Sequence, residues 1–133
     1  MALTKILVPI DGTDNSFRAL EFAAEIAHRF EATLDVVHIT DERTDATEEI
    51  LDRARSVLSG TGVEAELEVS TDLDLDFRPA DRVGKDILAL VEDRGYDHVV
   101  MGHESSGTVE RAIIGSAAET VLRGERVPLT VVP

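Results

Sequence analysis

At 133 residues the chain is long enough for one domain and too short for two, and its lack of cysteine excludes disulfides, thiolate catalysis and cysteine metal clusters. Its 27 acidic and 13 basic residues give a formal net charge of −14, which argues against nucleic-acid and membrane partners because those surfaces are also negative. Hydrophobic residues make up 43% of the chain, so we expect a folded cytoplasmic protein without a membrane span, whose acidic surface resembles that of salt-adapted (halophilic) proteins.

Five short segments have the composition of β-strands. The first is a short continuous apolar run, which is typical of a parallel strand that is buried on both faces of a sheet. The strand signal recurs through Leu34, Val36 and Val37 in the second segment, and again in the fourth and fifth segments. The third alternates acidic with apolar residues and therefore predicts an edge strand with one exposed face. The predicted strands cover residues 3–10, 33–39, 64–69, 96–102 and 129–132.

Apolar residues recur at helical spacing between these strands and predict four helices. Side chains that can cap a helix N-terminus precede three of them: Thr13 or Asp14, Thr44 or Asp45, and Ser116. Strands and helices that alternate over short connections predict an α/β fold with a parallel sheet, in a single domain that covers residues 1–133. The acidic segment 71–80, which ends at Pro79-Ala80, is expected to be a loop.

Two of the predicted strands end in residues that suit a ligand site. Pro9-Ile10-Asp11-Gly12 ends the first strand, and a stretch rich in glycine and hydroxyl groups, 102–116, follows the fourth. Ligands of open α/β sheets bind at the carboxyl ends of the strands, where the strand order reverses. There Asp11 can accept hydrogen bonds from an adenine amino group or a ribose hydroxyl, while the 102–116 loop and the helix N-terminus at Ser116 can hold phosphate. The alternative is that Asp11 only forms a turn and caps the first helix.

Three segments resemble the universal stress protein family. They are residues 5–16 (KILVPIDGTDNS), the strand end Val37-His38-Ile39, and the stretch from Val100-Met101-Gly102 to Gly115-Ser116. The resemblance covers nearly the whole chain and implies a Rossmann-like open sheet of five parallel strands in the order 3-2-1-4-5, with helices on both faces. It further implies a homodimer paired through the last strand, Leu129–Val132, and, in one branch of the family, an ATP site.

The ATP-binding branch of this family carries Gly, two residues, Gly, nine residues, and then Gly-Ser or Gly-Thr. In this sequence Gly102, Gly115 and Ser116 match that spacing, but Ser105 replaces the second glycine and Glu104 adds a carboxylate. Serine limits the approach of the backbone to phosphate, and the carboxylate repels a triphosphate unless Mg²⁺ intervenes. If ATP binds, with or without Mg²⁺, the resemblance implies contacts with Pro9, Ile10, Asp11, Ile39, Met101, Gly102, Ser105, Gly115, Ser116 and Ala117.

The function implied is a stress-response module with an adenine nucleotide between the loops after the first and fourth strands. Two alternatives stay open: a dimeric interaction protein whose altered site binds no nucleotide, and a slow ATP hydrolase. We expect no catalytic residue, because the sequence shows no dedicated base to activate water. We also expect no metal ligands among the four histidines, since their spacing does not suit zinc.

Overall fold

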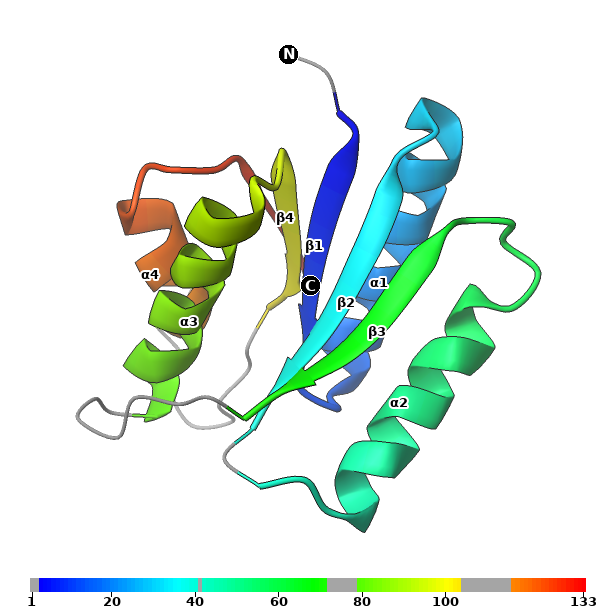
Figure 1. Cartoon of the computed structure of the whole chain (residues 1–133), viewed down its shortest axis with the longest axis horizontal. Helices are drawn as coiled ribbons and strands as arrows, with labels where there is room; N and C mark the ends of the chain where they lie inside the picture. Colours follow the sequence, from blue (N-terminus) through cyan, green and yellow to red (C-terminus); the bar gives the residue numbers. More distant parts are fainter. Residues whose placement is uncertain (1–2, 41, 72–78, 104–115) are drawn as a thin grey trace.

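The computed structural model describes residues 3–40, 42–71, 79–103 and 116–133, in which strands and helices alternate along the chain (Figure 1). The strands are β1 (Lys5–Ile10), β2 (Thr33–Ile39), β3 (Ala65–Ser70), β4 (His98–Gly102) and β5 (Leu129–Val132). The helices are α1 (Asp14–Phe30), α2 (Asp45–Leu58), α3 (Pro79–Arg94) and α4 (Ser116–Arg123). Within the described ranges, no helix is long and apolar enough to cross a membrane.

The five strands form one parallel sheet in the order β3-β2-β1-β4-β5, as predicted. From β1 the chain first builds outward through β2 to β3, and it then returns to add β4 and β5 on the other side of β1. The strand order therefore reverses between β1 and β4, which is where open α/β sheets hold ligands. The prediction of an edge position for the acidic strand is also confirmed, because β3 is the end of the described sheet.

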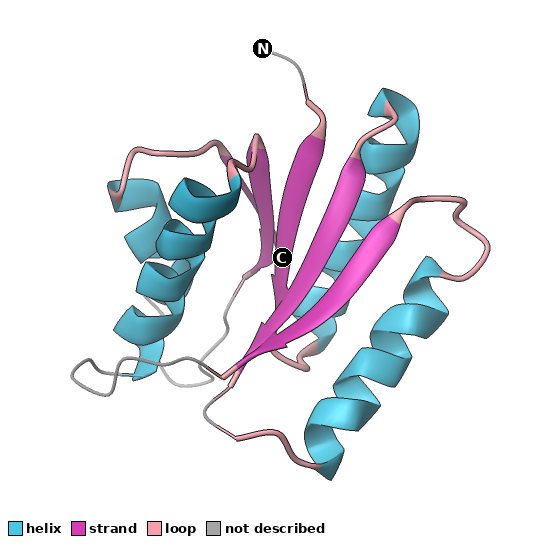
Figure 2. Cartoon of the chain, in the orientation of Figure 1, coloured by secondary structure: helices cyan, strands magenta, loops and turns pink. Residues whose placement is uncertain are grey.

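The helices form two layers, one on each face of the sheet (Figure 2). On the α1/α2 face, Ile6, Val8, Leu34 and Val36 are buried against the alanine-rich side of α1 and against α2. On the α3/α4 face, Leu7, Val37 and Val99 are buried against Ile87 and Val91 of α3 and Val121 of α4. Consecutive residues of β1 and β2 thus enter opposite cores, because side chains alternate along a strand. This explains why β1 reads as a continuous apolar run.

The ends of several elements differ from the prediction. β1 begins at Lys5, and the Asp97 carboxylate accepts hydrogen bonds from the backbone N–H groups of Thr4 and Lys5, at 3.0 and 2.9 Å. The side-chain bonds take the N–H donors of Thr4 and Lys5, while the carbonyl oxygens of these two residues still accept from the backbone N–H groups of Thr33 and Asp97. The predicted loop 71–80 is wrong at its end, since Pro79 and Ala80 begin α3. A proline fits the first turn of a helix because no N–H is needed there. Residues 72–78 of that prediction lie outside the described residues.

Gly84 lies inside α3, where glycine normally lowers helix stability. A Cβ at this position would lie 2.5 Å from Cβ of Thr120 and 3.0 Å from the carbonyl oxygen of Ala117, both in α4. The absence of a side chain therefore lets α3 and α4 approach closely over the sheet.

A polar cluster joins the end of α3 to β2 and β3. The Tyr96 hydroxyl donates a hydrogen bond to the Asp35 carboxylate. The Arg94 guanidinium donates to both carboxylate oxygens of Glu68, at 2.6 and 2.8 Å. The ammonium of Lys5 lies 5.0 Å from the centre of the Tyr96 ring, a distance at which a cation is attracted to an aromatic face. Burial and the bond to Asp35 raise the pKa of Tyr96 from 10.0 to about 12.

The raised pKa of Tyr96 predicts a loss of stability at high pH. Because the folded state holds this proton more tightly than the unfolded state, the stabilisation is complete below pH 10 and is lost as the pH rises from 10 through 12. Tyr96 is the only tyrosine and the chain has no tryptophan, so the phenolate absorbance reports this residue alone. We expect a midpoint near 12 in the native protein and about 10 in the urea-unfolded chain. A native midpoint near 10 would contradict the burial argument.

Candidate functional site

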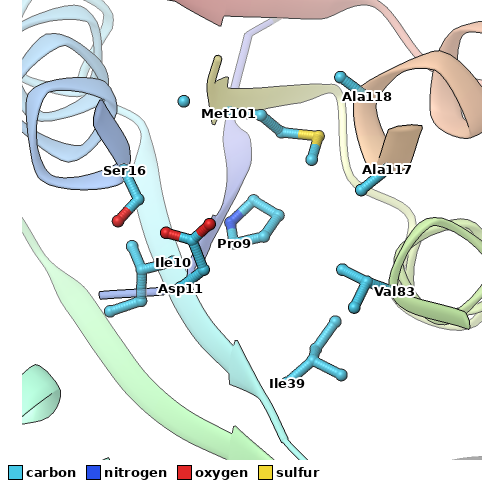
Figure 3. Close-up of a pocket in the computed structure, with 10 residues that line it drawn as sticks. Pro9, Ile10, Asp11, Ser16, Ile39, Val83, Met101, Ala117 and Ala118 are labelled. Atoms are coloured by element: carbon cyan, nitrogen blue, oxygen red, sulfur yellow. The ribbon is translucent and has the colours of Figure 1, made fainter. Parts of the chain in front are cut away.

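A pocket lies where the carboxyl ends of β1, β2 and β4 meet the N-terminal turns of the helices (Figure 3). Its volume is about 130 Å³. Most of its lining is apolar, and the polar side chains come from Asp11 and Ser16. The described lining residues are Pro9, Ile10 and Asp11 at the end of β1, Ile39 of β2, Met101 and Gly102 of β4, Ser16 of α1, Val83 of α3, and Ala117 and Ala118 of α4.

Asp11 serves the turn before α1 with one carboxylate oxygen only. Its Oδ1 accepts hydrogen bonds from the backbone N–H and the hydroxyl of Thr13, at 3.0 and 2.6 Å. The Thr13 hydroxyl oxygen in turn accepts from the N–H of Ser16 at 3.2 Å and caps α1. Oδ2 of Asp11 has no hydrogen-bond donor among the described residues, and the side chain is exposed. The turn role and a ligand role are therefore compatible, because they use different oxygens.

The peptide that precedes Asp11 is fixed from the α1/α2 face. His38 is buried at the end of β2, and its Nδ1 donates to the carbonyl oxygen of Ile10 over 2.7 Å. A carbonyl can only accept, so Nδ1 carries the hydrogen of this bond. This bond links the carboxyl ends of β1 and β2 and holds Asp11 at the edge of the pocket.

Gly102 gives the first turn of α1 room to pack against the end of β4. A Cβ at Gly102 would lie 2.5 Å from the carbonyl carbon of Asn15 and 2.6 Å from the nitrogen of Ser16. The Asn15 side chain then donates from Nδ2 to the carbonyl oxygen of His103 at 2.6 Å, which holds the two segments together. The sequence interpretation assigned Gly102 to the approach of phosphate, whereas the structure shows that α1 already requires glycine there.

The structure brings together seven of the ten predicted site residues. Pro9, Ile10, Asp11, Ile39, Met101, Gly102 and Ala117 all line this one pocket. Ser116 is the first residue of α4, next to Ala117, and its side chain is not described. Ser105 and Gly115 lie outside the described residues.

Sequence reasoning missed three residues of the lining: Ser16, Val83 and Ala118. Ser16 and Ala118 belong to the first turns of α1 and α4, and helices that follow parallel strands begin at the ligand edge of the sheet. Their position could therefore have been inferred from the strand-end rule. Val83 gave no comparable signal, because its place depends on how α3 docks on the sheet.

Ionisable groups are scarce in the described part of the pocket. Asp11 is the only charged residue of the described lining, which contains no lysine or arginine. Nor do the described residues contain a group of three or more histidines and acidic residues that could hold a metal ion. The arrangement suits a mainly apolar ligand group that also donates a hydrogen bond to a carboxylate.

Comparison with known proteins identifies the family. The model of the universal stress protein family matches residues 2–133. The chain belongs to the universal stress protein family. It is 31% identical to a universal stress protein of Staphylococcus epidermidis over 89% of this chain and 76% of the relative. It is 26% identical to one of Methanocaldococcus jannaschii over 96% of this chain and 81% of the relative.

Solved universal stress protein structures share the fold. The protein from Archaeoglobus fulgidus in complex with dAMP aligns over 100% of both chains with 26% identity and a TM-score of 0.69. A universal stress protein in complex with cAMP aligns over 99% of this chain and 98% of its own, with a TM-score of 0.77 and 21% identity. The family and the sheet order predicted from the sequence are thus confirmed.

Proposed function

We propose that this universal stress protein binds an adenine nucleotide, with the base in the pocket at the carboxyl ends of β1, β2 and β4 and the ribose at the edge of the pocket beside Asp11. The observation that carries the proposal is the position of Asp11, whose Oδ2, unbonded by any described residue, lies on the edge of an apolar pocket at the reversal of strand order. The dAMP complex of the Archaeoglobus fulgidus relative supports the choice of ligand class. In this proposal residues 1–133 work as one domain.

The apolar lining suits a purine base. Ile39 and Val83 lie beside each other on the wall opposite Asp11, and Met101 closes the pocket from β4 (Figure 3). A volume of about 130 Å³ is below the range of about 300–1,000 Å³ typical of sites that enclose a whole drug-sized ligand. The described pocket therefore accommodates one ring system, and the remainder of a nucleotide extends out of it.

The phosphate group then lies toward the N-terminus of α4. Ala117 lines the pocket at this N-terminus, where unpaired N–H groups and the positive end of the helix dipole favour an anion. One phosphate suits this arrangement better than three, because Asp11 is the only charge in the described lining and the chain carries a net charge of −14. In the sequence, the carboxylate of Glu104 and the side chain of Ser105 also disfavour a triphosphate. We expect AMP to bind more tightly than ATP.

A titration of AMP into protein labelled at its methionine methyl groups tests this proposal. Met101 lines the pocket, and the chain has only one other methionine, Met1, which provides an internal reference. The methyl signal of Met101 reports the arrival of a base directly, because aromatic rings shift the resonances of groups against which they pack. Addition of ATP to the same sample ranks the two nucleotides.

The proposal includes a second copy of the chain as partner. β5 is an edge of the described sheet, so strand pairing between two copies through Leu129–Val132 can extend the sheet. A role in a stress response and a cytoplasmic location are further predictions of the same proposal.

A further inference from the structure

Large apolar side chains are exposed along one side of α1. Phe22 is 43% exposed and Phe30 is 62% exposed, and the partly buried Ile26 lies between them. The three residues recur at intervals of four, so they form one row along the helix, here called the α1 stripe. Water contact with two aromatic side chains is costly, which points to a surface that is covered in the assembled protein.

The α1 stripe lies on the β5 side of its helix. Arg18 precedes Phe22 by four residues, and its Nε donates to the carbonyl oxygen of Pro133, just beyond β5, over 2.9 Å. About 140° around the helix from Phe22, the Phe17 ring packs against Arg53 of α2, whose guanidinium carbon lies 4.1 Å from the ring centre. The stripe therefore continues along the flank of α1 that faces away from α2 and toward the edge strand.

A third exposed apolar residue lies next to the same edge on the opposite face of the sheet. Leu122 of α4 is 51% exposed. Thr120 of α4 faces α3, as its close approach to Gly84 shows. Two residues further along a helix a side chain has turned through about 200°, so Leu122 faces away from α3, toward the outer side of β5. Phe22, Phe30 and Leu122 are the three large exposed apolar residues of the described chain.

The main chain of β5 has its own unused groups at this edge. Val99 N–H donates to Pro128 and His103 N–H donates to Val132, so Pro128, Thr130 and Val132 direct their backbone groups toward β4. Because these groups alternate along a strand, those of Leu129 and Val131 point away from the sheet. In an antiparallel pair of two β5 strands, Leu129 of one copy would pair with Val131 of the other, with Thr130 at the symmetry axis.

We infer that the α1 stripe and Leu122 are buried against a second copy of this chain, on the two faces of a continuous sheet formed by antiparallel pairing of β5. This inference rests on the strand pairing proposed above and extends it to the helices. A two-fold axis perpendicular to the sheet keeps each face of one copy next to the same face of the other. The two α1 helices then lie on one face, and the two Leu122 side chains lie on the other.

The spacing of the elements explains why the stripe carries large side chains. α1 packs over β1 and β4, and two β5 strands separate the β4 strands of the two copies. At about 4.8 Å per strand the β4 strands are about 14 Å apart, which exceeds the distance of about 8–10 Å at which helices pack directly. Phenylalanine side chains can reach across this gap, whereas alanines would leave it open.

The distribution of charge and the buried area both favour a second copy of this chain as the partner. Two copies that each carry −14 repel, but neither the α1 stripe nor Leu129–Val132 contains an acidic residue. A four-residue strand alone provides a small part of the roughly 800 Å² per partner that a stable interface buries. With about 200 Å² per phenylalanine, the exposed fractions of Phe22 and Phe30 add roughly 200 Å² of aromatic surface on each copy.

Sedimentation equilibrium in concentrated KCl, which screens the net charge, tests the inference. We expect the unmodified protein to be a dimer and the double variant Phe22→Ser/Phe30→Ser to dissociate with a Kd at least about 100-fold higher, since buried aromatic residues dominate interface energies. Glu21→Ser/His28→Ser is the matched control: it changes two exposed residues on the other flank of α1 and should leave the Kd unchanged.

A third variant distinguishes the contribution of the α1 stripe to dimer stability from that of β5 pairing. Val131→Pro removes the outward N–H of β5 without affecting the bonds to β4, and it should also weaken the dimer. If Val131→Pro dissociates the protein while Phe22→Ser/Phe30→Ser does not, the strand pairing stands and the stripe is contradicted. A monomeric unmodified protein at high concentration would overturn both. Nucleotide binding does not affect these outcomes, because no residue of the stripe lines the pocket.

Chemical cross-linking provides a measurement that does not depend on the folding of the serine variant. The chain has no cysteine, so a single introduced cysteine is a unique attachment point. A short bis-maleimide should join Ile26→Cys chains into covalent dimers and leave Glu21→Cys chains as monomers. Equal yields from the two variants would contradict the inference.

Discussion

Replacing Gly102 with alanine is expected to lower the free energy of unfolding by about 3 kcal/mol, the upper end of the usual range for added core volume. The new methyl group would lie 2.5 Å from the Asn15 carbonyl carbon and 2.6 Å from the Ser16 nitrogen. Both are backbone atoms in the first turn of α1, so no side-chain rotation can relieve the contact. Either α1 moves away from β4 or the end of β4 bends, and both changes disrupt the core. Urea unfolding followed by circular dichroism measures the loss.

Gly60→Ala is the matched control for this substitution. Gly60 follows α2 in a left-handed conformation, with a φ of 80°, and nothing lies within 4 Å of a Cβ built there. Its replacement should cost only the backbone strain of about 1–2 kcal/mol that a side chain meets in this conformation. A Gly102→Ala protein that is as stable as Gly60→Ala would show that α1 does not require glycine at the end of β4.

Replacing Asp11 with asparagine is expected to weaken AMP binding by about 10–100-fold, the cost of losing a hydrogen bond to a charged group. Asparagine can keep the turn, because its side-chain oxygen accepts from the Thr13 N–H and hydroxyl as Oδ1 of Asp11 does. The substitution removes the second oxygen, which we propose accepts the ribose hydroxyl. Calorimetric titration of both proteins with AMP measures the change, and their unfolding midpoints should agree closely.

Thr13→Ala separates the turn from the ligand contact. It removes the hydroxyl that caps α1 and should cost about 1 kcal/mol of stability, but it leaves the Asp11 carboxylate in place. AMP affinity should therefore change little. If Thr13→Ala weakened binding as much as Asp11→Asn does, the turn rather than the free oxygen would be the contribution of Asp11 to the pocket.

The sequence predicted the bounds of two strands without error. β2 and β5 have the predicted bounds, Thr33–Ile39 and Leu129–Val132. β1 begins later than predicted, and near its start the side chain of Asp97 accepts hydrogen bonds from the backbone N–H groups of Thr4 and Lys5. Such a bond joins residues that are more than 90 positions apart, so no local pattern reveals it.

The candidate site could be predicted as far as it depends on topology. Asp11, Ile39 and Met101 lie at the carboxyl ends of parallel strands, and the order of those strands brings them to one pocket. Val83 could not be predicted, because α3 begins at Pro79, in a segment that reads as an acidic loop, and its docking depends on the contact of Gly84 with α4. The sequence also contained no sign that packing requires glycine at position 102, because the atoms that exclude a side chain there belong to the first turn of α1, far away in the sequence.

The methionine methyl titration with AMP tests the central claim most directly, because it reports both binding and its location. The account predicts that the Met101 signal shifts progressively and saturates while the Met1 signal stays in place, and that ATP gives a smaller effect at equal concentration. A Met101 signal that does not move at AMP concentrations at which calorimetry detects binding would place the base elsewhere. If the Met101 signal does not shift and calorimetry detects no binding, this pocket does not hold an adenine nucleotide.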